Sequence, residues 1–103
     1  MTINLKKQGQ DSIVVFLSGR FDTSASPVFE QKVKPFLDGG AFDIVLDFKD
    51  LNYISSSELY LLLQAYMVMN LNKRKLIIRN LGEPVRGVFD ATGLISLFVE
   101  DKA

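Results

Sequence analysis

The sequence contains no cysteine and no histidine among its 103 residues. The lack of cysteine excludes disulfides, thiol catalysis and thiolate metal sites, and it suits a reducing compartment. The lack of histidine removes the commonest general base and the commonest metal ligand. An enzyme is therefore the least expected class of protein, and we expect neither a cofactor nor a bound metal.

An excess of charge of one sign is also missing, because Lys plus Arg and Asp plus Glu each number 12 and the formal net charge is zero. Such a chain has no long-range attraction to nucleic acid or to anionic membranes. The first ten residues are polar and charged, unlike a secretory signal. The longest apolar run, Leu59 to Leu71, is too short to span a bilayer. These features predict a cytoplasmic protein that neither binds nucleic acid nor inserts into membranes.

The length is that of one ordinary domain, and no linker or repeat interrupts it, so we expect residues 1–103 to form a single domain. Apolar runs rich in β-branched residues predict strands. The run at 12–18 is nearly continuous, which is typical of a strand buried on both faces, and Gly19 to Asp22 are expected to turn out of it. The expected strands cover residues 2–7 (at a sheet edge), 12–18, 42–48, 74–79 and 97–99.

Three helices are expected between these strands. Ser26 is expected at the N-cap of the first helix, with Pro27 at its first position, and Gly39-Gly40 ends it. Pro84 opens the third helix and Gly93 closes it. The buried face of the first helix is expected to comprise Phe29, Val33, Phe36 and Leu37. The alternation of helix and strand predicts an α/β domain with a mixed sheet of four to five strands and helices packed on it.

The second helix is apolar on nearly every side. One face, expected to lie on the sheet, comprises Leu59, Leu62, Leu63, Tyr66 and Met67. The opposite side carries Tyr60, Leu61, Val68 and Leu71, with Gln64 as the only polar residue among them. A helix of this kind is buried twice. The second side is explained either by burial under the first helix or a terminal segment, or by contact with a partner protein.

A serine-rich segment precedes this helix. Ser55 and Glu58 match the S-x-x-E capping box, in which Ser55 caps the third amide and Glu58 reaches back. Such a cap would be worth about 1 kcal/mol and would leave the Ser57 hydroxyl free in the first turn. The orphan amides and the dipole at a helix N-terminus also tolerate negative charge, so a phosphate could be placed there without melting the helix. The structural and the regulatory interpretations are compatible.

In the order and spacing of its motifs the chain resembles the STAS domain (sulfate transporter and anti-sigma factor antagonist). It is most similar to the free-standing bacterial anti-sigma factor antagonists, and the resemblance covers nearly the whole chain. Each motif alone is short, but their order and spacing together are fairly specific. The matching segments are Leu17-Ser18-Gly19-Arg20-Phe21-Asp22, Phe29-Glu30, Ile44-Val45-Leu46-Asp47, residues 51–57, Asn80-Leu81, Val85, Val88, Phe89 and Thr92-Gly93-Leu94.

The resemblance implies a partner-switching protein. In that family the unmodified domain binds an anti-sigma factor that is itself a serine kinase, and binding displaces the sigma factor. The kinase then phosphorylates a loop serine, the complex dissociates, and a serine phosphatase resets the switch. The family pattern places the acceptor at Ser57, with Ser56 as the second choice. The residues expected at the partner surface are Asp22, Ser55, Ser56, Ser57, Glu58, Tyr60, Leu61 and Gln64.

Two positions depart from the family pattern. Glu58 stands where the family has a glycine directly after the acceptor. Ser55 stands where the family often has an aspartate, two residues before the acceptor. Glu58 adds bulk and a negative charge beside the acceptor, which disfavours a second anion there. This departure supports a second hypothesis, in which the chain is a constitutive STAS accessory subunit that binds the ATPase of a lipid-trafficking ABC transporter.

Three aspartates suggest functional roles but can also be explained more simply. Asp22 matches the aspartate that lies near the loop in the family, but it is also explained as a turn residue or a helix cap. Asp47 and Asp50 suggest a metal site, yet the sequence offers no third ligand. A small-molecule sensor would need a polar-lined pocket, which the sequence does not reveal.

Overall fold

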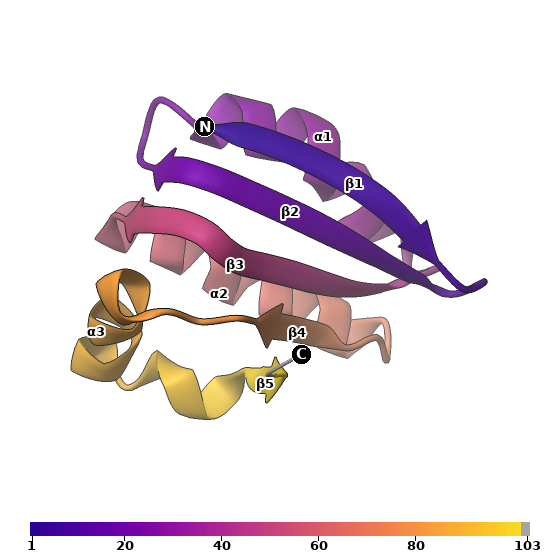
Figure 1. Cartoon of the computed structure of the whole chain (residues 1–103). Coiled ribbons are helices and arrows are strands. Elements are labelled where there is room, and N and C mark those ends of the chain that lie inside the picture. Colours follow the sequence, from indigo (N-terminus) through magenta and orange to yellow (C-terminus); the bar gives the residue numbers. More distant parts are fainter. Residues whose placement is uncertain (102–103) are drawn as a thin grey trace.

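The computed structural model describes residues 1–101, and its backbone forms a five-stranded sheet with helices packed on it (Figure 1). The strands lie in the order β1-β2-β3-β4-β5. Their bounds are Thr2–Gln8, Ser12–Phe21, Asp43–Ile54, Leu76–Arg79 and Val99–Asp101. The helices are α1 (Ser26–Gly39), α2 (Ser56–Leu71), α3 (Glu83–Thr92) and a 3-10 turn at Leu94–Leu97.

The sheet is mixed, as the sequence predicted. β1 pairs antiparallel with β2 through a hairpin in which Gly9 adopts a φ of 70°, a conformation that glycine accepts without strain. β2, β3, β4 and β5 then pair in parallel, joined by helical crossovers. The fold class and the edge position of the first strand are confirmed.

Helices α1 and α2 lie side by side and cover one face of the sheet (Figure 1). The hydrophobic core lies between these helices and the sheet, where the rows Ile13–Ile44–Leu76 and Val15–Leu46–Ile78 run across three parallel strands. From the helices, the core receives Phe29, Val33 and Leu37 of α1 and Leu59, Leu62, Ala65 and Met69 of α2. α3 closes the core at one end, where the Phe89 ring lies 6.2 Å from the Phe48 ring.

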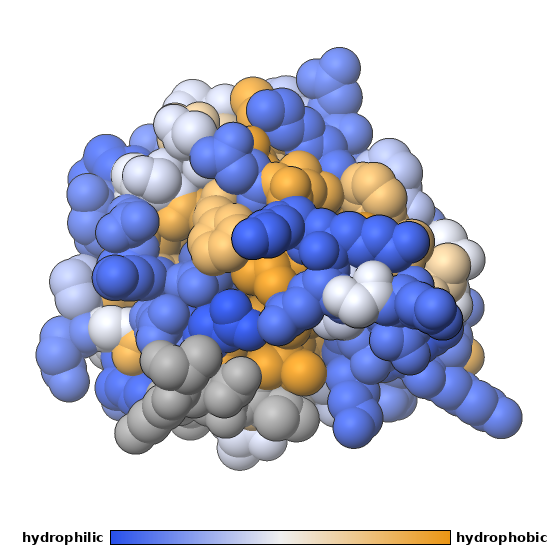
Figure 2. All heavy atoms as spheres, turned by 45° about the vertical axis from the view of Figure 1, so that its right-hand side comes forward, coloured by the Kyte–Doolittle hydropathy of each residue, from blue (hydrophilic) through white to orange (hydrophobic). Residues whose placement is uncertain are grey.

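The opposite face of the sheet is only partly covered. Val14 and Val45 are buried there, whereas Phe16 on β2 is 39% exposed, so the expected burial of this strand on both faces is wrong at its centre. The reason is that none of the helices within the described part of the chain crosses the middle of this face (Figure 1). Figure 2, which looks obliquely onto it, shows apolar side chains surrounded by hydrophilic ones.

Several predicted boundaries need correction. Gly19 to Phe21 continue β2 instead of turning out of it, with an irregular register at Gly19, whose φ is 100°. β3 extends to Ile54, well past residue 48. Ser26 is the first residue of α1 and Ala25 occupies the N-cap, so Pro27 is second. The last strand begins at Val99, since Leu97 belongs to the 3-10 turn.

The orientation of α2 also differs from the prediction. Ala65 and Met69 face the core, whereas Met67, expected on the sheet, is 57% exposed. Because the helix is apolar nearly all round, its pattern contains no single stripe that fixes its rotation. Burial under α1 explains part of the second side, since Leu61 and Val68 lie half-buried against α1. Tyr60 and Leu71 are exposed, and contact of this part with a partner protein stays a prediction. Phe36 of α1, expected in the core, is only half-buried and lies 6.2 Å from the Phe42 ring.

Within residues 1–101, no helix combines the length and apolar character needed to cross a membrane.

Candidate functional site: a serine cluster around Glu58

The serine-rich segment lies where β3 ends and α2 begins. Ile54 is the last residue of β3, Ser55 is extended at the N-cap position, and Ser56 starts the helix. The amide of Ser55 donates to the carbonyl oxygen of Phe21, at the end of β2, with an N···O distance of 3.1 Å. The junction is therefore fixed at the carboxyl ends of two parallel strands, the edge at which open α/β sheets commonly bind their ligands.

Glu58, in the first turn of α2, is the centre of a hydrogen-bonded cluster. Its side chain is 1% exposed although it carries a carboxylate. Ser57 Oγ donates to Glu58 Oε2 at 3.0 Å, and Ser55 Oγ donates to the same oxygen. Ser26 Oγ, at the start of α1, donates to Glu58 Oε1 at 2.6 Å. The two carboxylate oxygens thus accept three serine hydroxyls, which offset much of the cost of burying the charge.

The capping box predicted from Ser55 and Glu58 is wrong in its hydrogen bonds. Ser55 does occupy the N-cap position, but its side chain makes no capping hydrogen bond to the described backbone, and its hydroxyl donates to Glu58. Glu58 does not reach the Ser55 amide, because the Phe21 carbonyl already accepts from it. The Ser57 hydroxyl, expected to be free, is bonded to Glu58 and lies 3.2 Å from Ser55 Oγ.

The cluster also determines the ionisation of Glu58. Burial of the carboxyl raises its pKa, but the hydrogen bonds from the serine hydroxyls and the backbone amide of Glu58 outweigh burial and hold the pKa below its ordinary value. The carboxylate is therefore charged at neutral pH. Its negative charge lies in the first turn of α2, where the partial positive charge of the helix end favours an anion.

Asp22 lies close to the serine cluster along the backbone, but its carboxylate does not join the cluster. It follows Phe21, yet its carboxylate accepts from the amide and the hydroxyl of Ser24, at 3.1 and 2.6 Å. The Ser24 hydroxyl, more than any other group, holds the pKa of Asp22 below its ordinary value, and the Arg20 guanidinium 3.8 Å away contributes. Of the two explanations for Asp22, these contacts match the turn residue.

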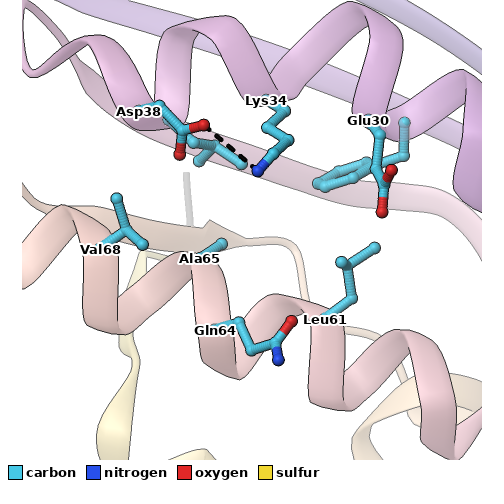
Figure 3. A pocket seen from close by; sticks show the side chains of 9 residues that line it. Glu30, Lys34, Asp38, Leu61, Gln64, Ala65 and Val68 are labelled. Carbon is cyan, nitrogen blue, oxygen red and sulfur yellow. Dashed lines mark ion pairs between the residues drawn. The ribbon is translucent and has the colours of Figure 1, made fainter.

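A groove between α1 and α2 begins next to the serine cluster. Its apolar floor includes Phe29, Leu37, Ala65 and Val68, and Leu61 projects into it from α2 (Figure 3). Gln64 and Glu30 line its rim, and Lys34 pairs with Asp38 along α1 at 3.3 Å. Tyr60, on the neighbouring surface of α2, is 61% exposed. Of the predicted partner-surface residues on α2, four are exposed (Ser56, Ser57, Tyr60 and Gln64) and Leu61 is half-buried. The prediction is wrong for Glu58, because its buried carboxylate is turned to the serine hydroxyls and is not available to a partner.

The metal site considered for Asp47 is not supported. Asp47 is 7% exposed and accepts from the Lys49 amide at 2.9 Å and from Asn80 Nδ2 at 3.2 Å. Arg79 Nη1 lies 3.8 Å from its other oxygen. The described residues contain no group of three or more acidic side chains that could hold a metal ion. Asp47 instead links β3 to β4 and to the turn that follows it.

Ser26 is the residue that sequence reasoning missed. The sequence predicts Ser26 at the N-cap of α1, whereas in the structure its hydroxyl donates to the Glu58 carboxylate, 32 residues away. Arg20 was also missed as a neighbour of Tyr53, whose ring lies 4.0 Å from the guanidinium carbon. No local spacing signals such contacts, because they depend on how the carboxyl ends of β2 and β3 are brought together.

The comparisons with known proteins agree with this fold. The family model of the STAS domain matches residues 2–102, so the chain belongs to the STAS domain family. An anti-sigma-B factor antagonist of Bacillus subtilis (strain 168) is 32% identical over 95 residues, which cover 91% of this chain and 86% of that protein.

Two solved structures share the fold. The anti-sigma factor antagonist SpoIIAA in its unphosphorylated form has a TM-score of 0.83 and 24% identity, covering 98% of this chain and 89% of the other. The Bacillus cell fate determinant SpoIIAA in the phosphorylated form has a TM-score of 0.77 and 22% identity, covering 98% and 92%. The same architecture is therefore found with and without a phosphate on SpoIIAA.

Proposed function

We propose that this chain is an anti-sigma factor antagonist, a non-catalytic protein of one domain spanning residues 1–103 that acts in the cytoplasm. It binds an anti-sigma factor of the serine-kinase type, and phosphorylation of Ser57 ends the binding. Ser56 is the second choice of acceptor. A serine phosphatase restores the unmodified form.

The observation that carries the proposal is the position of Ser57. It is exposed in the first turn of α2, on the surface that Tyr60, Leu61 and Gln64 continue toward the groove. This position combines an apolar and aromatic contact surface with an exposed serine. The 32% identity to a curated anti-sigma-B factor antagonist supports the same class of partner.

The switch follows from elementary electrostatics. A phosphate on Ser57 adds about −1.5 to −2 charge at pH 7 and three acceptor oxygens. The helix N-terminus tolerates this charge, so the domain stays folded. A partner packed over Tyr60 would have to desolvate the phosphate, and that cost weakens the complex. Binding is lost while the fold is kept.

The test is a capture experiment from native lysate of the source cells, with mass spectrometry to identify the bound proteins. The baits are wild type, Ser57→Asp, Ser56→Asp and Gln8→Glu, a control that places a charge in the β1–β2 hairpin at the other end of the sheet. We expect wild type and Gln8→Glu to capture an anti-sigma factor with a kinase domain, and Ser57→Asp to lose it. Loss with Ser56→Asp alone would move the switch to Ser56.

One observation favours the second candidate function. The Ser57 hydroxyl is already bonded to the buried Glu58 carboxylate, which suits a serine that is never modified. In that case the chain is a constitutive accessory subunit of a lipid-trafficking ABC transporter. Capture of a transporter ATPase by all four baits alike would establish this alternative and overturn partner switching.

A further inference from the structure

We propose that Glu58 is a specificity-determining residue that restrains the phosphorylation of Ser57, because its buried carboxylate holds the Ser57 hydroxyl in a cluster anchored by Ser26. This inference rests on the proposed function, since it concerns the reaction at the same serine. It adds a residue of α1 to the regulation of a site on α2.

The geometry leaves the carboxylate little freedom. Ser57 Oγ and Ser55 Oγ both donate to Glu58 Oε2, while Ser26 Oγ holds Oε1 at 2.6 Å. With 1% of its surface exposed, Glu58 cannot exchange these donors for water without leaving its position. The Ser57 hydroxyl therefore faces a fixed negative charge, although the residue itself is exposed.

Phosphoryl transfer needs a Ser57 hydroxyl that is released from Glu58 and turned toward ATP. Ser57 Oγ bonds to the γ-phosphorus of ATP as the bond from that phosphorus to the β–γ bridging oxygen breaks. ADP leaves with the bonding electron pair, and the hydroxyl proton passes to a base of the kinase. In the cluster, that proton instead points at Glu58 Oε2, and the anionic γ-phosphoryl group would approach the carboxylate.

Glu58 is also a poor substitute for the kinase base. Its pKa lies below the ordinary value, so it holds the hydroxyl as an acceptor without taking the proton at neutral pH. Reaction therefore requires Ser57 to give up a hydrogen bond to a charged group. The loss of one such bond corresponds to roughly a tenfold or larger factor in rate.

The product is affected in the same way. Phosphoserine at position 57 no longer donates to Glu58, and its charge lies beside the carboxylate. Ser26 and Ser55 remain as donors, so they hold Glu58 in place while the phosphate turns toward solvent. The cluster thus favours the unmodified form, which is the form that binds the partner.

The experiment compares phosphorylation rates with ATP and the anti-sigma factor kinase captured by the wild-type bait. The variants are wild type, Glu58→Ala, Glu58→Gln, Ser26→Ala and the control Glu83→Ala, which removes an exposed first-turn glutamate from α3. Intact mass gives the rate, and peptide sequencing confirms the site. We expect Glu58→Ala to react about tenfold faster or more, Glu58→Gln and Ser26→Ala to show smaller increases, and Glu83→Ala to match wild type.

Equal rates for wild type and Glu58→Ala would overturn the restraint and leave the proposed function intact. Phosphorylation of no variant would also overturn it, while the binding measured in the same samples tests the partner separately. If Glu58→Ala does not fold, Ser26→Ala decides, and a rate equal to wild type overturns the proposal. Carbon-13 NMR titration adds a readout without kinase: the Glu58 pKa must rise in Ser26→Ala, and an unchanged pKa contradicts the cluster.

Discussion

Ser26 and Glu58 join the first turns of α1 and α2 through a hydrogen bond of 2.6 Å from Oγ to Oε1. This contact fixes the relative position of the two helices at the end where the serine segment lies. The groove between the same helices begins beside it, so one residue pair supports both the predicted phosphorylation site and the predicted partner surface.

Substitution of Ser26 by alanine is expected to lower the free energy of unfolding by about 1–3 kcal/mol, because a buried carboxylate loses one of its donors. Urea unfolding monitored by circular dichroism measures this change. Thr23→Ala, at an exposed position in the preceding loop, is the control and is expected to stay within about 0.5 kcal/mol of wild type. A Ser26→Ala protein as stable as the control would contradict the contact.

The stability that Glu58 contributes should depend on pH. Its pKa is lowered in the folded protein, so the contribution is present above the ordinary glutamate value of 4.5 and is lost as pH falls through the lower folded value. Wild type should therefore exceed Glu58→Gln in stability at pH 7, and the difference should shrink below pH 4.5. Urea titrations at several pH values give both curves, and a difference that grows in acid would refute the assignment.

Tyr60 should contribute to partner affinity without contributing to the fold. It is 61% exposed and lies one turn from Ser57, so Tyr60→Ala should weaken binding of the captured anti-sigma factor by about tenfold or more. Leu71→Ala removes an apolar side chain that is 83% exposed at the far end of the same helix, and it should bind like wild type. Isothermal titration calorimetry distinguishes the two, and equal affinities for Tyr60→Ala and wild type would place the interface elsewhere.

Phe89 should be essential to the packing of α3. Its ring lies 6.2 Å from Phe48 and 5.7 Å from Phe98, and the side chain is fully buried. Phe89→Ala should therefore cost about 3–5 kcal/mol, a large part of the stability of an ordinary domain. Met67→Ala, at a 57% exposed position of α2, is the control. Similar denaturation midpoints for both variants would contradict this description of the core.

Most of the fold could be predicted from local patterns. The apolar runs at 12–18 and 42–48 gave two central strands, and Gly40 and Gly93, with φ values of 72° and 74°, end helices as expected. The boundaries at Gly19 and Ile54 could not be predicted, because strand length there depends on pairing between β2 and β3. Tertiary packing also determines the rotation of α2, because its sequence is apolar on nearly every side and does not mark a single buried face.

The position of the candidate site could be predicted, but its hydrogen bonds could not. The spacing of Ser55 and Glu58 predicted a capping box, and tertiary structure replaced it with a cluster that includes Ser26. This arrangement depends on the contact between Ser26 and Glu58, which are 32 residues apart, so no local sequence pattern reveals it. The family resemblance identified Ser57 as the acceptor, and that assignment stays a prediction.

The most direct test of the account is the intact mass of the wild-type chain after long incubation with the captured anti-sigma factor and ATP, followed by peptide sequencing. Partner switching predicts the addition of a single phosphoryl group, located on Ser57, together with loss of the complex on size-exclusion chromatography. An unchanged mass in a sample where the complex forms and the kinase is active would contradict it.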